Sequence, residues 1–435
     1  METISVGLLG LGTVGGGVAR ILRENAGHIS DRLGARIEVR RVAVRDLRKA
    51  RDVEVPSAVL SDRAEDVIED PSIQIVVELV GGVTDAKRFV LAAIQQGKHV
   101  VTANKALLAL HGDEIFAAAS AHGVDVFYEG AVGGGIPIIR TLRESFASDR
   151  VQRIVGILNG TTNYILTSMA ATGADFEGML AEAQRLGYAE ADPTADVDGH
   201  DAAQKLAILA SLAFSTRISA KDVSVEGIRR LTAADFSSAS QEGYTIKLLG
   251  MAERRKEAVA VSVQPCLVPG GSMLAHVNGV LNAVSIESDA LGTSVLIGRG
   301  AGDLPTGSAV ASDVIDVARN ILLGSSGRIP HLATRDEAML PRKVFDEGDV
   351  ATPFFLRFTV KDTPGVFGRV ATALGQAEVS LKTVRQDVDQ PGGAVPLLVL
   401  THSAAAKQVR KAVEAIDGFE TTVAPTHVMR VLDLD

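Results

Sequence analysis

The stretch "GLLGLGTVGGGVARILREN" (7–25) decides the fold of the first part of the chain, because it joins an apolar strand to a helix through a glycine-rich turn. Its glycines follow the pattern G-x-G-x-x-G. The first permits a tight turn, the second lets the backbone approach a pyrophosphate, and the third packs helix against strand. A plain tight turn is the alternative, but the position after a first strand favours dinucleotide binding. The expected cofactor contacts in this turn are Gly10, Gly12, Thr13, Val14 and Gly15.

Strands and helices alternate on both sides of this turn. Strand-like runs lie at 3–9, 36–44, 73–80, 98–103 and 124–130, with a helix expected at 84–96. Such alternation predicts a parallel, doubly wound sheet. We therefore expect an α/β protein with an N-terminal Rossmann-type domain over residues 1–130. A helix at about 305–322 is expected to return to this domain.

Beyond residue 130 most strands lack a crossover helix, and the helices come in blocks. Strand-like runs lie at 153–160, 259–268, 282–288 and 294–298, and helices are expected near 162–172, 175–186, 199–214 and 219–231. A strand-rich sheet with grouped helices predicts an α+β substrate domain over residues 131–325.

The last part of the chain has a different texture. Residues 326–350 read as a linker, because the sequence from 322 onward is rich in Gly, Ser and Pro. Residues 351–435 then follow the order β-α-β-β-α-β, which is typical of a ferredoxin-like domain.

The end of the second strand bears on the choice of dinucleotide. Arg45 stands there, and an arginine at this edge can accommodate the 2′-phosphate of NADP. Arg48, Lys49 and Arg51 extend the positive charge, although they could equally form a solvated loop. The pattern favours NADP over NAD without excluding either.

The stretch "EADPTADVDGHDAAQKLAI" (190–208) crowds acids ahead of a single lysine. If a helix begins near Gly199, Asp201 and Lys205 share one face, because residues four apart are neighbours. The flanking residues are apolar, and a lysine buried among them needs a partner. An ordinary i,i+4 ion pair at a helix end is the alternative to a functional pair.

The stretch "TANKALLA" (102–109) follows another apolar strand. Thr102, Asn104 and Lys105 therefore stand at the carboxyl end of that strand, where ligands bind in open α/β sheets. Thr102 or Asn104 could instead cap the following helix. The turn "GRGAG" (298–302) offers further N–H donors near a cofactor, or is only a glycine turn.

Composition limits the class of protein. The net charge is −9 and the pI is about 5.6, which argues against nucleic-acid binding. A single cysteine, Cys266, fits a reducing cytoplasm, and neither a signal peptide nor a membrane span is expected. The nine histidines lack ligand spacing, so no zinc site is expected.

Six separated motifs in one order resemble those of homoserine dehydrogenases. They are "GLGTVG", "TANKALLA", "EGAVGGGIPII" (129–139), "LNGTTNYIL" (158–166), "GYAEADPTADVDGHDAAQKL" (187–206) and "GRGAGDLPTGSAV" (298–310). The tail, with "DTPGVFGRVA" (362–371), is similar to an ACT domain. No counterpart of an aspartate kinase portion is found, so a monofunctional enzyme is expected.

The resemblance implies reversible NAD(P)H-dependent reduction of L-aspartate 4-semialdehyde to L-homoserine. It implies that Lys205 is the proton donor and that Lys105 contacts cofactor and substrate. It further implies substrate contacts at Glu190 and Asp201. Gly187 and Gly302 are implied to line the same cleft, as substrate-binding and cofactor-binding residues respectively.

The resemblance also implies a monovalent cation site, usually for sodium, on the backbone of Glu129, Val132, Gly134 and Ile136. For the tail it implies feedback binding of L-threonine at the turn 362–365, although such domains can also serve only to dimerise. The resemblance further implies that residues 131–325 also serve as the dimerisation domain, so a homodimer or homotetramer is expected.

Two other functions fit parts of the sequence. An aldehyde-oxidising dehydrogenase would need a cysteine nucleophile, and Cys266 lies in a strand-like run where it is poorly placed. A catalytically silent amino-acid sensor would not need the acid and lysine residues of 190–205.

Homoserine oxidation is expected to speed up from pH 7 to 10, because it needs the free amine of Lys205 as base.

Overall fold

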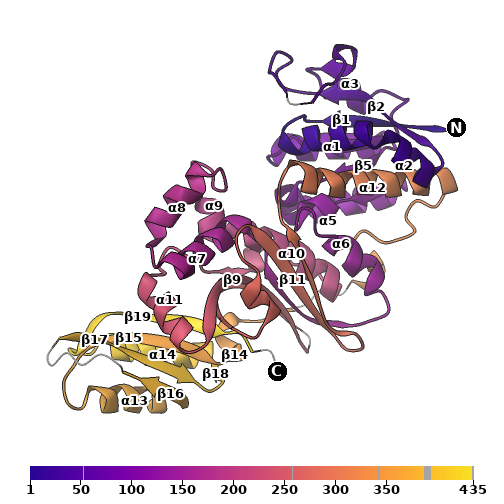
Figure 1. The fold of residues 1–435 in the computed structure, drawn as a ribbon. Helices are drawn as coiled ribbons and strands as arrows, with labels where there is room; N and C mark the ends of the chain where they lie inside the picture. The colour runs from indigo at the N-terminus through magenta and orange to yellow at the C-terminus, as the bar shows by residue number, and fades with distance from the viewer. Residues whose placement is uncertain (52, 257, 340–342, 387–392, 434–435) are drawn as a thin grey trace. The chain divides into compact units, whose positions relative to one another are not determined.

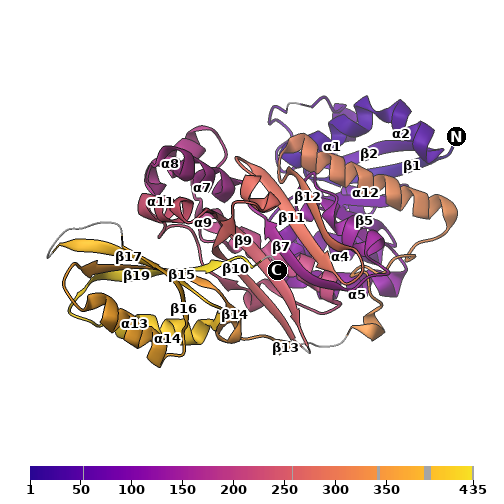
Figure 2. The same cartoon turned by 60° about the horizontal axis from the view of Figure 1, so that its bottom comes forward.

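The computed structural model describes residues 1–51, 53–256, 258–339, 343–386 and 393–433. Small parts of the expected linker and C-terminal domain therefore lie outside the described residues. Figures 1 and 2 show the helices and strands of the chain from two directions. These elements group into two compact units, each built from separate stretches of the sequence. The first comprises residues 1–160, 201–223 and 281–342, and the second comprises 161–200, 224–280 and 343–435. This grouping leaves the expected three-domain division as a prediction.

A six-stranded parallel sheet forms the centre of the first unit. Its spatial order is β3-β2-β1-β4-β5-β6, the order of a dinucleotide-binding sheet. The strands are β1 (Thr3–Leu9), β2 (Arg36–Ala43), β3 (Leu60–Ser61), β4 (Ile75–Glu78), β5 (His99–Thr102) and β6 (Val126–Phe127). The predicted α/β class and Rossmann-type sheet are confirmed.

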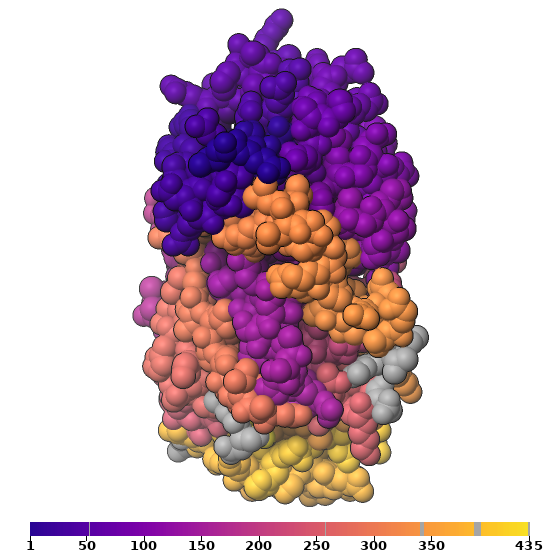
Figure 3. Space-filling model, turned by 90° about the vertical axis from the view of Figure 1, so that its right-hand side faces the viewer, coloured from indigo at the N-terminus to yellow at the C-terminus, as the bar shows by residue number. Residues whose placement is uncertain are grey.

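Helices from both ends of the first unit's sequence cover this sheet. They are α1 (Thr13–Glu24), α2 (Ala26–Leu33), α3 (Glu65–Ile68), α4 (Thr84–Gln95), α5 (Lys105–His122) and α12 (Asp303–Leu323). Helix α12 lies against the earlier part of the unit (Figure 3, orange against indigo and purple). Its Val310, Val314 and Val317 pack into one core with Val18 and Leu22 of α1.

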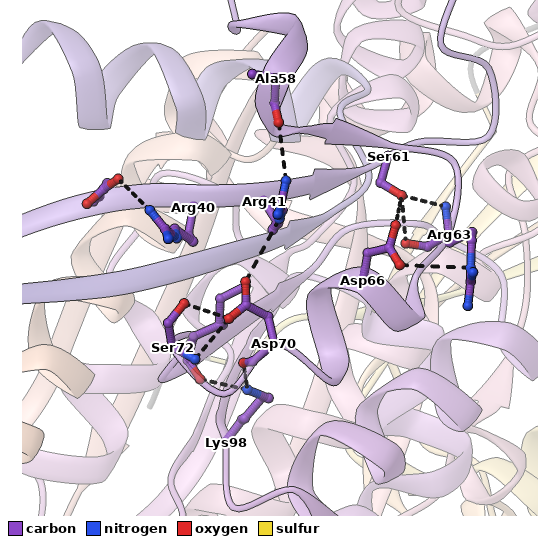
Figure 4. A network of polar contacts seen from close by, with 11 residues as sticks. Arg40, Arg41, Ala58, Ser61, Arg63, Asp66, Asp70, Ser72 and Lys98 are labelled. Atoms are coloured by element: carbon purple, nitrogen blue, oxygen red, sulfur yellow. Dashed lines mark hydrogen bonds and ion pairs between the residues drawn. The ribbon is translucent and has the colours of Figure 1, made fainter.

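The amino ends of β4 and β5 are tied together by a polar network (Figure 4). Lys98, which is almost fully buried, donates from Nζ to the carbonyl oxygens of Asp70 at 2.6 Å and Ile73 at 2.7 Å. The Asp70 carboxylate in turn accepts bonds from the N–H and hydroxyl of Ser72. This lysine therefore fastens the edge of the sheet opposite the carboxyl ends of the strands.

The rest of the first unit carries a small antiparallel sheet, in the order β12-β11-β7, and one long helix. The strands are β7 (Val151–Ile157), β11 (Leu281–Ser288) and β12 (Gly292–Arg299). Helix α10 (His200–Phe214) belongs to this unit from Asp201 onward. Shorter helical segments are η2 (Glu129–Ala131), α6 (Ile138–Arg140), η3 (Thr141–Ser145) and η4 (Ala220–Asp222).

The second unit begins with helices and a long hairpin. Its elements up to residue 280 are α7 (Gly160–Thr172, from 161 onward), α8 (Phe176–Arg185), α9 (Thr194–Val197), β8 (Ser224–Val225), α11 (Ala233–Gln241), β9 (Tyr244–Arg255), β10 (Ala258–Pro269) and η5 (Met273–His276). Strands β9 and β10 pair over twelve residues each.

The helix expected near 219–231 is wrong. The structure has a short 3₁₀ turn, η4, then strand β8, and the helix α11 begins only at Ala233. Strand β8 pairs with β10, so its residues satisfy their backbone groups in the sheet. Asp235 and Thr232 form a capping box that starts α11 only after the end of the expected helix.

The C-terminal part of the second unit has the predicted ferredoxin-like order. Its main elements are β15 (Phe354–Lys361), α13 (Val366–Gln376), β16 (Leu381–Arg385), β17 (Ala394–Thr401), α14 (Ala406–Asp417) and β19 (Thr422–Val431). Short elements precede or interrupt it, namely β13 (Lys343–Val344), η7 (Glu347–Asp349), β14 (Ala351–Thr352) and β18 (Ala404–Ala405). Strand β19 also pairs with β10, which makes this sheet continuous with the β9–β10 hairpin.

None of the helices in the described part of the chain is both long and apolar enough to cross a membrane.

Candidate active site

The turn after β1 has the shape that the glycine motif requires. Gly10 has a φ of 102°, and a Cβ there would lie 2.5 Å from a carbonyl oxygen of the loop after β4. A Cβ on Gly15 would collide with the carbonyl oxygen of Gly10, so only glycine allows α1 to pack this closely. Gly12 faces open space, and α1 begins at Thr13 and Val14 without a side-chain cap. The first N–H groups of α1 therefore remain available to a phosphate.

The loop after β2 carries exposed positive charge. Arg45 lies two residues beyond the strand, and its side chain is exposed. Lys49 and Arg51 line a cavity of about 580 Å³ together with Arg23 of α1. The Asp46 carboxylate accepts the N–H of residue 48 at 2.8 Å, so it is engaged with its own loop.

The carboxyl ends of β4 and β5 hold a buried acid that the sequence analysis missed. Glu78 is fully buried and accepts the Thr102 hydroxyl at 2.7 Å. Burial raises the pKa of Glu78, although the bond from Thr102 opposes this. Asn104 caps α5 by accepting the N–H of Leu107, which decides between the two expected caps. The only signal for Glu78 was a carboxylate ending an apolar strand.

Lys205 lies on α10 with most of its side chain buried, at 11% exposed. Its Nζ donates to the Asp201 carboxylate at 2.7 Å and to the Leu158 carbonyl at 2.8 Å. The expected helical pair of Asp201 and Lys205 is therefore present. Since an ammonium has three N–H groups, one of them is left for a further acceptor.

Asp201 joins two lysines. Its Oδ2 faces Lys205, while Oδ1 lies 3.1 Å from Nζ of Lys105, the first residue of α5. Burial alone would raise the pKa of Asp201, but the charges of Lys205 and Lys105 outweigh burial and lower it well below its ordinary value. Asn159 donates to the same carboxylate at 2.9 Å. Both lysines were predicted from the sequence, whereas no role was predicted for Asn159 or for the Leu158 carbonyl.

The other expected site residues are spread over both units. Gly302 caps the start of α12 with a φ of 130°, in the first unit. Glu190 and Gly187 lie in the second unit, in the loop between α8 and α9, where the Glu190 side chain is exposed. Gly187 has a φ of 76°. Their expected contacts with a substrate at Lys205 stay predictions.

The four residues expected to hold a monovalent cation lie in the first unit around η2. Glu129, Val132 and Ile136 are almost fully buried, and Gly134 has a φ of 52°. The Glu129 carboxylate accepts the N–H groups that start α6, and its own N–H donates to Asp313 at 2.7 Å. Among the described residues, no group of three or more His, Cys, Asp and Glu could hold a metal ion. Cation binding by the backbone carbonyls of these four residues stays a prediction.

Cys266 is fully buried in β10. Burial raises the pKa of its thiol to about 12. A thiol that is neither accessible nor ionised at neutral pH is no nucleophile. This disfavours the aldehyde-oxidising alternative.

Comparison with known proteins decides between the remaining possibilities. A family model described as "Homoserine dehydrogenase" matches residues 137–315, and one described as "Homoserine dehydrogenase, NAD binding domain" matches residues 10–129. The homoserine dehydrogenase of Pseudomonas aeruginosa is 42% identical over the full length of both chains. The chain belongs to the homoserine dehydrogenase family. It is therefore placed among oxidoreductases acting on a CH–OH group in aspartate-family amino-acid biosynthesis.

Solved structures of the family agree with this assignment. The crystal structure of a homoserine dehydrogenase from Thiobacillus denitrificans has a TM-score of 0.94 and 43% identity, covering 100% of this chain and 99% of that one. A hyperthermophilic archaeal homoserine dehydrogenase in complex with NADPH has a TM-score of 0.62 and 27% identity, over 73% of this chain and 98% of that one. An ACT domain model matches residues 354–418, which confirms the expected C-terminal domain.

Proposed function

We propose that Lys205 is the proton donor in the reversible reduction of L-aspartate 4-semialdehyde to L-homoserine by this chain. The observation that supports this most is the state of its ammonium group, which is buried and has two of its three N–H groups fixed. The Asp201 carboxylate lies 2.7 Å from this ammonium group and accepts one of its protons. A buried cation with one unused proton is suited to an alkoxide.

A reduced nicotinamide bound at the glycine turn would supply the hydride. Hydride addition to the aldehyde carbon leaves a negative oxygen. Lys205 stabilises this oxygen and donates its remaining proton to it, which yields the alcohol. In the reverse direction the neutral amine accepts the hydroxyl proton. Lys105 adds a second positive charge, held by Asp201, toward substrate and cofactor.

The substrate carries an α-ammonium group that needs an acid. Both oxygens of Asp201 already have cationic or amide partners. Glu190 has an exposed carboxylate, and we assign it to this ammonium group, with Asp201 holding the lysines and Gly187 allowing the loop to turn.

The preferred cofactor is NADP(H) in this proposal. Arg45 suits a 2′-phosphate, Lys49 and Arg51 of the same loop add positive charge, and Asp46 is engaged with its own loop. The archaeal relative is described as a complex with NADPH. The first N–H groups of α1 and the start of α12 at Gly302 would contact the cofactor, and the backbone near Thr102 would border it. The ratio of kcat/KM for NADPH to that for NADH measures the preference.

The remaining parts of the proposal concern ions, effectors and assembly. Na⁺ is proposed to bind the backbone carbonyls of Glu129, Val132, Gly134 and Ile136, so activity should rise when NaCl replaces a choline salt. L-Threonine is proposed to bind the ACT domain at the turn 362–365, where Gly365 starts α13 with a φ of 89°. A homodimer or homotetramer in the cytoplasm completes the proposal.

Replacement of the lysine tests its role. Lys205→Ala should lower kcat for aldehyde reduction by at least about 100-fold while NADPH binding is retained. Lys98→Met is the matched control, because Lys98 is also buried but fastens the opposite edge of the sheet. Full turnover by Lys205→Ala would remove Lys205 from the mechanism.

The pH dependence gives a second test. The rate of homoserine oxidation by the wild type should climb from pH 7 toward pH 10, because only the neutral amine can accept the proton. A profile that is flat over this range would show that another group titrates. Aldehyde reduction should instead be favoured near neutral pH.

A further inference from the structure

Asn159 lies between β7 and α7 and is buried, with 5% of the residue exposed. Its Nδ2 donates to Oδ2 of Asp201 at 2.9 Å. The residue before it, Leu158, accepts a proton of Lys205 through its carbonyl at 2.8 Å. Two consecutive residues of one turn therefore contact both members of the Asp201–Lys205 pair.

The charges around Asp201 show why an amide is suited to this place. One carboxylate already faces two ammonium groups, that of Lys105 on α5 and that of Lys205 on the same helix α10. These are the charged side chains that the described contacts place against it. An amide donor fills the remaining position on Oδ2 without adding a third cation or a second anion.

We propose that Asn159 is a positioning residue for the proton transfer. By fixing the plane of the Asp201 carboxylate it fixes the direction of the Lys205–Asp201 bond. Together with the Leu158 carbonyl this leaves a single N–H of Lys205 in one defined direction. The neutral amide also keeps one carboxylate, rather than two, beside the amine that must give up its proton. This inference rests on Lys205 being the proton donor.

Two variants of Asn159 separate positioning from charge. Asn159→Ala removes the donor, and kcat should fall about 10- to 100-fold with little change in KM, as expected when a hydrogen bond to a charged group is lost. Asn159→Asp has nearly the same shape but adds an anion. It should keep the amine protonated to higher pH and move the alkaline rise of homoserine oxidation upward by about one pH unit or more.

Asn320→Ala is the matched control. Asn320 is also buried, and its amide donates to the carboxylate of Asp125 at 3.0 Å, where no lysine ion pair is found among the described residues. It should change stability without moving the pH profile. Thermal unfolding and NADPH binding check that each variant is folded. If Asn159→Ala does not fold, the near-isosteric Asn159→Asp still tests the proposal.

The outcomes are distinguishable. If the wild-type profile is flat, the role of Lys205 fails. If the wild-type rate of homoserine oxidation rises with pH, and both Asn159 variants show the same pH dependence and the same kcat, only the role of Asn159 is overturned. A shifted profile in Asn159→Asp together with a kcat loss in Asn159→Ala supports the proposal, because a purely structural asparagine would move neither.

Discussion

Three buried lysines in this chain show how the partners of an ammonium group decide its use. Lys98 has two backbone carbonyls and Lys205 has one carbonyl and a carboxylate. Lys247 on β9 donates to the Val277 carbonyl at 2.6 Å and to two asparagine side chains. Only Lys205 combines a charged partner with an unused proton. All three lysines are buried, but only Lys205 has the partners that suit proton transfer.

Lys247 should make stability depend on pH. Burial lowers its pKa from 10.5 to about 8. Below pH 8 the cost of burying the charge is fully present. Between pH 8 and 10.5 the folded state releases the proton first, so the free energy of unfolding rises with pH, by at most about 3 kcal/mol. Lys247→Met should abolish this rise, measured by urea unfolding at several pH values. An equal rise in both proteins would contradict the assignment.

At the residue scale the sequence predicted what is local. Asp201 and Lys205 are four apart on one helix, so their pairing followed from helical spacing. The approach of Lys105 and Asn159 to the same carboxylate joins residues 96 and 42 positions away in sequence. Nothing in their spacing encodes this contact. Lys105 and Asn159 both belong to motifs shared with the resembled family, but the contact of Asn159 with Asp201 is seen only in the structure.

At the scale of elements, α1 and α12 cross where two glycines meet. A Cβ on Gly17 would collide with the Asp303 carbonyl oxygen, and one on Gly307 would lie 2.9 Å from the Gly17 carbonyl carbon. Gly17→Ala should therefore destabilise the chain by about 1–3 kcal/mol and weaken NADPH binding. Gly16→Ala is the control, since its nearest neighbour would be 3.7 Å away. It should instead stabilise by about 0.5–1 kcal/mol. Thermal unfolding of both variants measures the difference.

The wrongly predicted helix at 219–231 shows that helical periodicity does not encode tertiary contacts. That segment carries apolar residues at helical spacing, yet residues 224–225 pair with β10 and a capping box starts α11 at Thr232. A Cβ on Gly227 would lie 2.5 Å from the Val197 carbonyl oxygen, so the chain passes another segment closely there. Tertiary contacts of this kind override local preference. Strand-helix alternation in residues 1–130 had no such competitor and was read correctly.

At the scale of the whole molecule, the ACT domain is joined to the preceding part of its unit by a buried ion pair. Arg357 of β15 donates to Asp235 of α11 at 2.7 Å, and Asp235 is fully buried. Arg357→Met should leave this carboxylate without its cation and cost about 3–5 kcal/mol. Lys407→Ala is the control, because its pair with Asp349 is exposed and should matter by less than about 1 kcal/mol. Equal midpoints of urea unfolding would refute the difference.

Helix α12 also limits when the nucleotide-binding domain can fold during synthesis on the ribosome. The nucleotide-binding sheet ends at residue 127, yet a helix that fills its core is synthesised only after some 175 further residues, at 303–323. Until then Val18, Leu22 and their neighbours lack their apolar cover. The nascent first domain should consequently remain protease-sensitive and unable to retain nucleotide until most of the protein has emerged. Cofactor capture thus becomes a late event in biogenesis.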